Sequence, residues 1–152
     1  MKYYLAGPWF SDYEKEVYNK VIKDLREYFL TETDELFIPA EHEVKDAWTL
    51  PNLEWGKEVY NIDMVGLDPA DVVIVLDHGF TSDCGTAWEM GYAKAKGKYI
   101  IHILCQEDSQ SPYSLMLANS ANETYKVSDL AFCIYNQVKL NLFNYKNSVE
   151  VK

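Results

Sequence analysis

Two acids stand in the run Asp83-Cys84-Gly85-Thr86-Ala87-Trp88-Glu89-Met90-Gly91-Tyr92-Ala93, the first candidate for a chemical role. Asp83 falls at the start of an expected helix, where exposed backbone N–H groups favour a carboxylate. Glu89 lies about one and a half turns further along that helix. An acid flanked by small and apolar residues is unusual on a solvated helix face, so the run is a candidate site. The alternative is that Asp83 only caps the helix and that Glu89 is a surface glutamate.

Asp63 is a further candidate acid, in the helix expected before the central strand. It falls among Val59, Ile62 and Val65 in the C-terminal half of that helix, where the helix dipole disfavours a carboxylate. Such a position needs a compensating interaction, and contact with a ligand would supply one. The alternative is an ordinary exposed helix residue.

The segment after the first expected strand, Gly7-Pro8-Trp9-Phe10, is the third candidate, together with Tyr4 within the strand. Glycine lets the chain turn sharply. Two exposed aromatic side chains on a ligand-side loop could stack on a flat base. The alternative is that both rings pack in the core, as Trp and Phe commonly do.

Other sites of catalysis or cofactor binding lack their motifs. The chain has no GxGxxG, GxxxxGK[ST] or GxSxG sequence. The histidines are scattered without the spacing of a metal site, and His102, within an apolar run, is expected in the core. The 3 cysteines are widely spaced without a CxxC pair, which supports neither a disulfide framework nor a zinc site. Free thiols fit a reducing cytosol.

Strand-like and helix-like stretches alternate along the chain. Short apolar runs predict strands at residues 3–6, 36–38, 71–77, 98–104 and 124–127. Helical spacing predicts helices from Ser11 or Asp12 to Phe29, and over residues 53–67, 85–95, 114–118 and 129–143. Polar loops are expected at residues 42–52, 78–83 and 107–112.

This alternation predicts an α/β fold of the Rossmann-like type, with an open parallel five-stranded sheet and helices on both faces. The length of 152 residues suits a single domain over residues 1–152. In such folds ligands bind at the carboxyl ends of the strands. The loops after Ala6, Ile38, Leu76 and Leu104 are therefore the ones expected to carry a site.

The charge and the N-terminus limit the partners and the location. A formal net charge of −10 repels phosphate backbones and anionic membrane surfaces, so neither nucleic acid nor a membrane is expected as a partner. A neutral or cationic small ligand fits this charge; the alternative is that the charge only maintains solubility. The apolar run within residues 1–10 is too short for a signal peptide or a membrane span. We expect a soluble, cytoplasmic protein.

Four segments combine into a more specific pattern. They are Tyr4-x-Ala6-Gly7-Pro8-Trp9-Phe10-Ser11, Tyr60-Asn61-x-Asp63, Ala70-Asp71-Val72-Val73 and Asp83-x-Gly85-Thr86-Ala87-x-Glu89-x-Gly91-Tyr92-Ala93. In order and spacing, over most of residues 3–118, this pattern resembles the nucleoside 2-deoxyribosyltransferase family. The C-terminal residues match poorly.

The resemblance implies a flavodoxin-like sheet, no cofactor, and a retaining transfer of 2-deoxyribose between nucleobases in nucleotide salvage. Glu89 would attack the anomeric carbon to form a glycosyl-enzyme ester. Asp63 would help to protonate the leaving base, and Tyr4 would orient Glu89. Asp83 would bind the 5′-hydroxyl of the sugar.

The remaining implied contacts concern the base and the subunit interface. Trp9 and Phe10, presented by the turn at Gly7, would line the base pocket, which Glu43 would also contact. Family enzymes build each site across a subunit interface, so Ser114-Leu115-Met116 would reach into the pocket of a neighbour in a homo-oligomer.

Departures from the family pattern leave other functions open. Ser114 stands where many members have Asn, and Glu43 where many have Gln. The tail from Ser148 to Lys152 does not match, so no role is assigned to it. The alternatives are a hydrolase of nucleosides or of nucleoside 5′-monophosphates and, in another class, a nucleobase-binding module without catalysis. The monophosphate hydrolases carry serine at the position of Asp83, whose charge would repel phosphate; free nucleosides are therefore expected as substrates.

Overall fold

The computed structural model describes residues 1–79, 83–106, 112–146 and 148–152. Much of the loops predicted at 78–83 and 107–112 lies outside the described residues. Among the described helices, none is long and apolar enough to cross a membrane.

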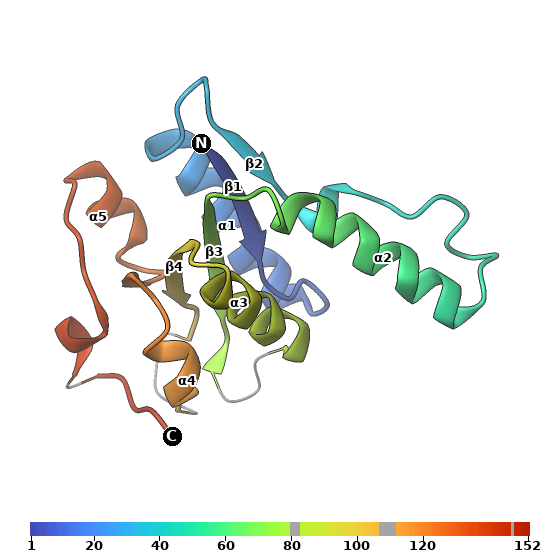
Figure 1. Cartoon of the computed structure of the whole chain (residues 1–152). Helices are drawn as coiled ribbons and strands as arrows, with labels where there is room; N and C mark the ends of the chain where they lie inside the picture. The colour runs from blue at the N-terminus through green and yellow to red at the C-terminus, as the bar shows by residue number, and fades with distance from the viewer. Residues whose placement is uncertain (80–82, 107–111, 147) are drawn as a thin grey trace.

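Five parallel strands form one sheet in the order β2-β1-β3-β4-β5, which confirms the predicted open parallel sheet (Figure 1). The strands are β1 (Lys2–Ala6), β2 (Glu35–Phe37), β3 (Val72–Asp77), β4 (Tyr99–Leu104) and β5 (Glu123–Lys126). After β1 the chain goes first to one neighbour, β2, and later to the other, β3. The carboxyl ends of β1 and β3 therefore flank the crevice where ligands bind in sheets of this order.

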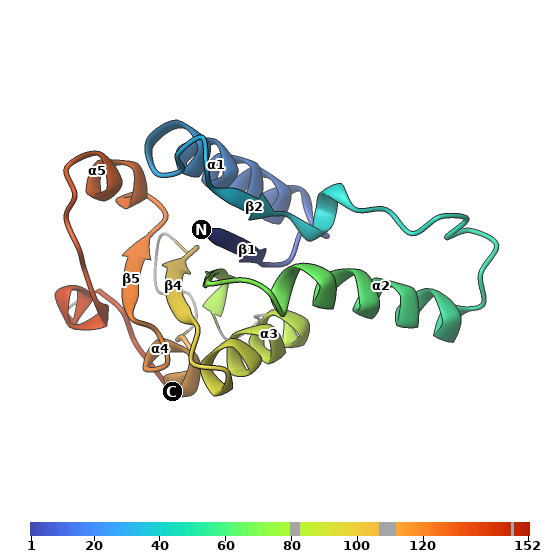
Figure 2. The same cartoon turned by 45° about the horizontal axis from the view of Figure 1, so that its top comes forward.

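Helices cover both faces of the sheet (Figure 2). The α-helices are α1 (Asp12–Tyr28), α2 (Asn52–Leu67), α3 (Cys84–Ala95), α4 (Leu115–Ala118) and α5 (Leu130–Tyr135), and the 3-10 turns are η1 (Pro39–Glu41) and η3 (Leu142–Tyr145). α1 and α5 lie on one face, and α3 and α4 on the other. α1 begins as predicted, because Ser11 accepts the N–H of Glu14 at 3.2 Å while the Glu14 carboxylate accepts the N–H of Ser11 at 2.7 Å.

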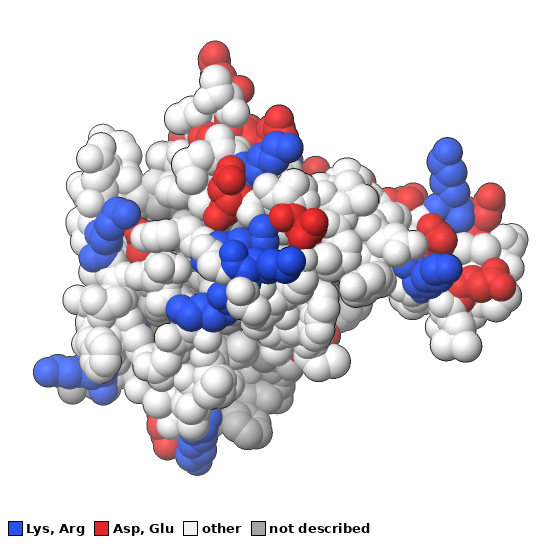
Figure 3. Space-filling view, viewed as in Figure 1, with Lys and Arg blue, Asp and Glu red and all other residues white. Residues whose placement is uncertain are grey.

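α2 is found over nearly the predicted residues, 53–67, but it does not pack one side along the sheet. It projects from the body of the molecule (Figure 1), and only its end, Gly66 and Leu67, is buried. Val65, an apolar residue in the last turn of the helix, is 70% exposed. Figure 3 shows charged side chains at the outer end of α2, whereas the surface between that end and the sheet is mostly uncharged.

The last predicted helix, over residues 129–143, is wrong beyond Tyr135. Gln137 takes a left-handed φ of 55°, which ends α5. The chain then runs beside β5, where the carbonyl of Leu140 accepts the N–H of Thr124 at 3.1 Å. Lys139 reaches the carboxylate of Glu123 at 2.7 Å. The apolar positions after Tyr135 therefore serve an extended segment that covers the edge of the sheet.

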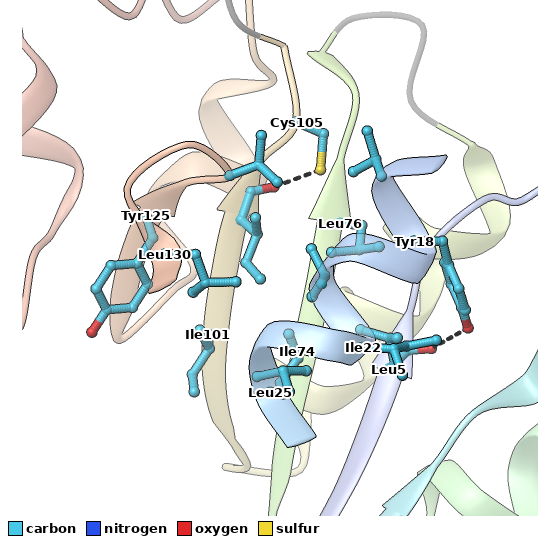
Figure 4. Close-up of a cluster of buried hydrophobic side chains, with 14 of the residues drawn as sticks. Leu5, Tyr18, Ile22, Leu25, Ile74, Leu76, Ile101, Cys105, Tyr125 and Leu130 are labelled. Carbon is cyan, nitrogen blue, oxygen red and sulfur yellow. Dashed lines mark hydrogen bonds between the residues drawn. The ribbon is translucent and has the colours of Figure 1, made fainter. Parts of the chain in front are cut away.

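Two layers of buried side chains enclose the sheet. Leu5, Ile74 and Leu76 point toward Ile22 and Leu25 of α1 (Figure 4). The alternate residues of the same strands, including Tyr4, Val73 and Val75, point to the other face and pack with Met90 and Ala93 of α3. Strand alternation thus places Tyr4 on the α3 side of the sheet.

Candidate active site

A hydrogen bond between Tyr4 and Glu89 lies at the centre of the candidate site. The Tyr4 hydroxyl donates to Oε1 of Glu89, joining β1 to α3. Tyr4 is fully buried, and Met90, the residue after Glu89, packs in the same layer. The carboxylate is therefore held in one orientation near the carboxyl end of β1.

The surroundings of Glu89 change its acidity. Burial, the largest effect, raises its pKa from 4.5 to about 7, against the hydrogen bond from Tyr4, which lowers it. The negative charges of Asp63 and Asp83 raise it further. The three predicted carboxylates therefore lie close enough for Asp63 and Asp83 to affect the ionisation of Glu89. Glu89 gains or loses its proton near neutral pH.

Asp63 occupies a different environment on α2. Its carboxyl is half-buried, and burial raises its pKa, while the charge of His42 acts in the opposite direction. The ring of Tyr60 on α2 meets that of Trp88 on α3 edge-on, with centroids 5.9 Å apart. Contact between the two helices therefore brings Asp63 to the side of Glu89.

A column of three stacked rings supports this cluster, and sequence reasoning missed it. Tyr4 stacks on Phe37 with centroids 5.7 Å apart, and Phe37 stacks on His42 at 4.2 Å. A Cβ added to Gly66 would lie 2.2 Å from the Phe37 ring, so glycine is needed where α2 approaches β2. A glycine inside a helical pattern was the available signal, since such a glycine can have a packing reason.

Asp83 is the N-cap of α3, as predicted. Its Oδ2 accepts the backbone N–H of Thr86 at 2.9 Å and the Thr86 hydroxyl at 3.1 Å. A Cβ at Gly85 would lie 2.8 Å from the same oxygen, so glycine leaves room for the carboxylate. Neither hydrogen bond uses Oδ1, and among the described residues Oδ1 has no other hydrogen-bond partner.

The loop after β1 presents its aromatic rings to solvent. A Cβ at Gly7 would lie 2.8 Å from Cβ of Leu76, so glycine lets this loop cross closely over β3. Trp9 is 44% exposed and Phe10 is 73% exposed. The alternative that both rings belong to the core is therefore wrong, and both remain available to a ligand.

The structure does not bring every predicted residue to Glu89. Glu43 is exposed in the segment after η1. Ser114 precedes α4 without a side-chain capping bond, and Met116 is 70% exposed. In the described part of this single chain, none of the three makes a hydrogen bond or ion pair with the carboxylate cluster.

His102 is a core residue, as predicted. It is fully buried, and its Nε2 lies 2.8 Å from Oδ2 of the equally buried Asp77. Within the described ranges, no group of three or more His, Cys, Asp and Glu side chains is arranged to hold a metal ion.

The arrangement suits chemistry shared between two carboxyl groups. Glu89 is oriented by a tyrosine and ionises near neutrality, as a nucleophile requires. Asp63 stands apart on another helix with its own raised pKa, as a proton donor requires. Unequal environments are what assign such roles within a pair of acids.

The chain is similar to known proteins over most of its length. Residues 3–137 match the model of a family described as nucleoside 2-deoxyribosyltransferase. A nucleoside deoxyribosyltransferase of Lactobacillus johnsonii is 26% identical over 146 residues, which cover 92% of this chain and 97% of that protein.

Two solved structures share the fold. A 2-deoxyribosyltransferase from Bacillus psychrosaccharolyticus superposes with a TM-score of 0.70 at 23% identity, covering 93% of this chain and 98% of that one. A CMP N-glycosidase of Clostridium botulinum superposes with a TM-score of 0.51 at 22% identity, covering 83% and 86%.

Proposed function

We propose, because the chain belongs to the nucleoside 2-deoxyribosyltransferase family, that it transfers 2-deoxyribose from a deoxynucleoside to a second nucleobase. Glu89 is the nucleophile, Asp63 the proton donor to the leaving base, and Tyr4 the group that orients Glu89. The reaction belongs to nucleotide salvage in the cytoplasm, needs no cofactor, and is carried by one domain.

The hydrogen bond from Tyr4 to Glu89 is the observation that carries this proposal. A glutamate that is only a surface residue of the helix would point away from the sheet, into solvent. This one turns toward a buried tyrosine, and burial brings its pKa to about 7. Its position beside the crevice between β1 and β3 supports direct contact with a bound sugar.

The transfer proceeds in two displacements. The ionised Glu89 carboxylate attacks C1′ of the sugar and forms an ester as the C1′–N bond breaks. The electron pair of that bond stays on the base nitrogen, which takes the proton of Asp63. The second base then attacks C1′, returns a proton to Asp63 and releases Glu89.

The charge of Glu89 also stabilises the transition state. The sugar carbon acquires positive charge as the C1′–N bond lengthens, and a carboxylate on one face of the ring offsets it. Burial of Asp63 raises its pKa, which favours the exchange of a proton between this carboxyl and the base. Glu89 must be ionised at the same moment, which the hydrogen bond from Tyr4 favours.

Other predicted residues bind the two ends of the substrate. Asp83 accepts a hydrogen bond from the sugar 5′-hydroxyl through Oδ1, the oxygen that the helix cap leaves unused. Trp9 and Phe10 stack on the base after the turn at Gly7, and Glu43 contacts its edge. Ser114 and Met116 complete the site of a neighbouring subunit, which the 70% exposure of Met116 in one chain supports.

An N-glycoside hydrolase is the nearest alternative, since it differs only in using water as the acceptor. Asp83 argues against a 5′-monophosphate substrate. A carboxylate and a phosphate oxygen about 4 Å apart repel by roughly 4 kcal/mol at an effective dielectric near 20. A 5′-hydroxyl instead donates a charge-assisted bond worth about 1.5–3 kcal/mol.

Incubation of the protein with deoxyinosine and a second base, such as cytosine, tests the function. Chromatography should show a new deoxynucleoside, and Glu89→Gln should abolish it while remaining folded. Free base and deoxyribose alone would identify a hydrolase. No turnover, with binding retained, would identify a binding module. A deoxynucleoside 5′-monophosphate that reacts equally well would contradict the role of Asp83.

A further inference from the structure

A cavity of about 220 Å³ lies between α1 and the chain segments that follow β1 and β2. Aromatic and aliphatic side chains form much of its lining, namely Trp9, Tyr18, Ile22, Ile38 and Ala40. It lies beside the loop that carries the exposed rings of Trp9 and Phe10. The mechanism above assigns no role to the residues on its α1 side.

Tyr18 is the polar group at the buried side of this cavity. The residue is only 3% exposed. Its hydroxyl donates to the carbonyl of Leu5 at 3.4 Å (Figure 4), and the backbone amide of Ala40 interacts with the same oxygen. One hydroxyl on α1 therefore joins the end of β1 to the turn after β2.

These two segments are the ones proposed to meet the base. Trp9 and Phe10 follow β1, and Glu43 follows the turn η1. Burial raises the pKa of Tyr18, and the charges of Glu89, Glu41 and Asp63 raise it further. The hydroxyl and the cavity are thus within electrostatic reach of the candidate centre.

We propose that Tyr18 is a positioning residue that sets base selectivity, by holding the loop that carries Trp9 at a fixed spacing from residues 38–43. The inference rests on the proposed function. A purine presents two fused rings and a pyrimidine one, so the spacing between the two segments decides how well each class fits. If this spacing is no longer held, the rates of steps in which a base is bound should change. The rate of a step in which no base is bound should stay the same.

Tyr18→Phe tests this inference, because it removes the hydroxyl and keeps the ring. The ratio of kcat/KM for deoxyinosine to that for thymidine should shift by about fivefold, the effect of one net hydrogen bond. Hydrolysis of the glycosyl-enzyme by water, with no base present, should keep its wild-type rate. A structural defect alone would lower kcat/KM for deoxyinosine and for thymidine by the same factor.

Tyr13→Phe is the matched control on the same helix. The Tyr13 hydroxyl donates to the carbonyl of Cys105 at 2.6 Å, away from the cavity, so the substrate ratio should stay at the wild-type value. Ala40→Val narrows the cavity from the opposite wall and should lower kcat/KM for deoxyinosine more than for thymidine. Thermal unfolding checks that all variants are folded.

The outcomes separate this inference from the proposed function. A wild-type protein that cleaves no deoxynucleoside would overturn both. An active wild type whose substrate ratio is unchanged in Tyr18→Phe would overturn the inference alone. Equal losses on both substrates, or a shift in Tyr13→Phe as large as in Tyr18→Phe, would do the same.

Discussion

At the scale of single residues, the acidity of Glu89 links Tyr4 to the pH dependence of the reaction. The Tyr4 hydroxyl lowers the pKa of Glu89, which burial has raised to about 7. In Tyr4→Phe that pKa should rise by about one to two units, because a hydrogen bond to a charged group is worth about 1.5–3 kcal/mol. The acidic limb of the profile of kcat/KM against pH should move upward accordingly.

Tyr3→Phe is the control for this prediction. Tyr3 lies on the same strand but on the α1 face, so its removal should leave the profile in place. An unchanged acidic limb in Tyr4→Phe would mean that the hydroxyl does not hold the ionised carboxylate.

Glu89 should also lower the stability of the fold at neutral pH. Folding raises its pKa from 4.5 to about 7. Between these values the folded protein holds a proton that the unfolded chain has released, so the free energy of unfolding falls as the pH rises. The full cost, reached above about pH 7, is at most about 3 kcal/mol.

Glu89→Gln cannot ionise and escapes this cost. Urea unfolding should show the variant gaining stability over the wild type between about pH 5 and pH 8, even though it has lost activity. A difference between the two proteins that is the same at both pH values would contradict the raised pKa.

At the scale of elements, the packing of Gly66 of α2 against Phe37 of β2 should affect both stability and activity. A Cβ at Gly66 would lie 2.2 Å from the ring of Phe37, whereas one at Gly56 on the same helix meets nothing within 4 Å. Gly66→Ala should cost about 1–3 kcal/mol through overpacking. It should also lower kcat/KM, because Phe37 supports Tyr4 and α2 carries Asp63.

Gly56→Ala makes the same chemical change where there is room. It should stabilise the helix by about 0.5–1 kcal/mol and leave kcat/KM unaltered. Urea unfolding and steady-state kinetics on both variants check the pair. Equal effects of the two substitutions would show that helix propensity, not the contact with Phe37, decides the outcome.

The strands were predictable from the sequence, whereas the end of α5 and the direction of α2 were not. β3 is an unbroken apolar run, so its burial on both faces follows from composition. α5 stops at Tyr135 because Leu140 pairs with Thr124 of β5, a contact that helical periodicity does not encode. Likewise, the direction of α2 depends on contacts with distant residues, namely Phe37 beside Gly66 and Trp88 beside Tyr60.

The candidate site was predictable to a similar degree. The resemblance pointed to Tyr4, Asp63 and Glu89, and the structure brings these three near one another. Phe37 and His42 were missed because the column depends on Phe37 stacking on Tyr4 of another strand. The local pattern around Phe37 does not show that its ring meets Tyr4, which is more than thirty residues away in the sequence.

At the scale of the whole molecule, the single chain leaves apolar side chains of α2 and α4 exposed to solvent. Leu53 and Val65 of α2 and Leu115 and Met116 of α4 are all exposed. Exposed apolar surface of this kind commonly marks an interface. It supports the expectation of a homo-oligomer in which Ser114 and Met116 enter the site of a neighbour.

Mixing two inactive variants tests whether sites are shared. Glu89→Gln lacks the nucleophile, and Met116→Asp should lack the residue that enters the neighbouring site. In a mixed dimer one site carries both defects and the other carries none, because each site takes Glu89 from one subunit and Met116 from the other. After unfolding and joint refolding, random pairing should restore about one quarter of the wild-type sites.

Sites built within one chain would give a different result. Every chain in the mixture would then carry one defect in its own site, and joint refolding would restore no activity above that of the separate variants. Size-exclusion chromatography of Met116→Asp alone shows whether the charge disrupts the assembly itself. A wild-type protein that is monomeric and fully active at assay concentration would refute the shared site directly, since Met116 would then have no neighbour to enter.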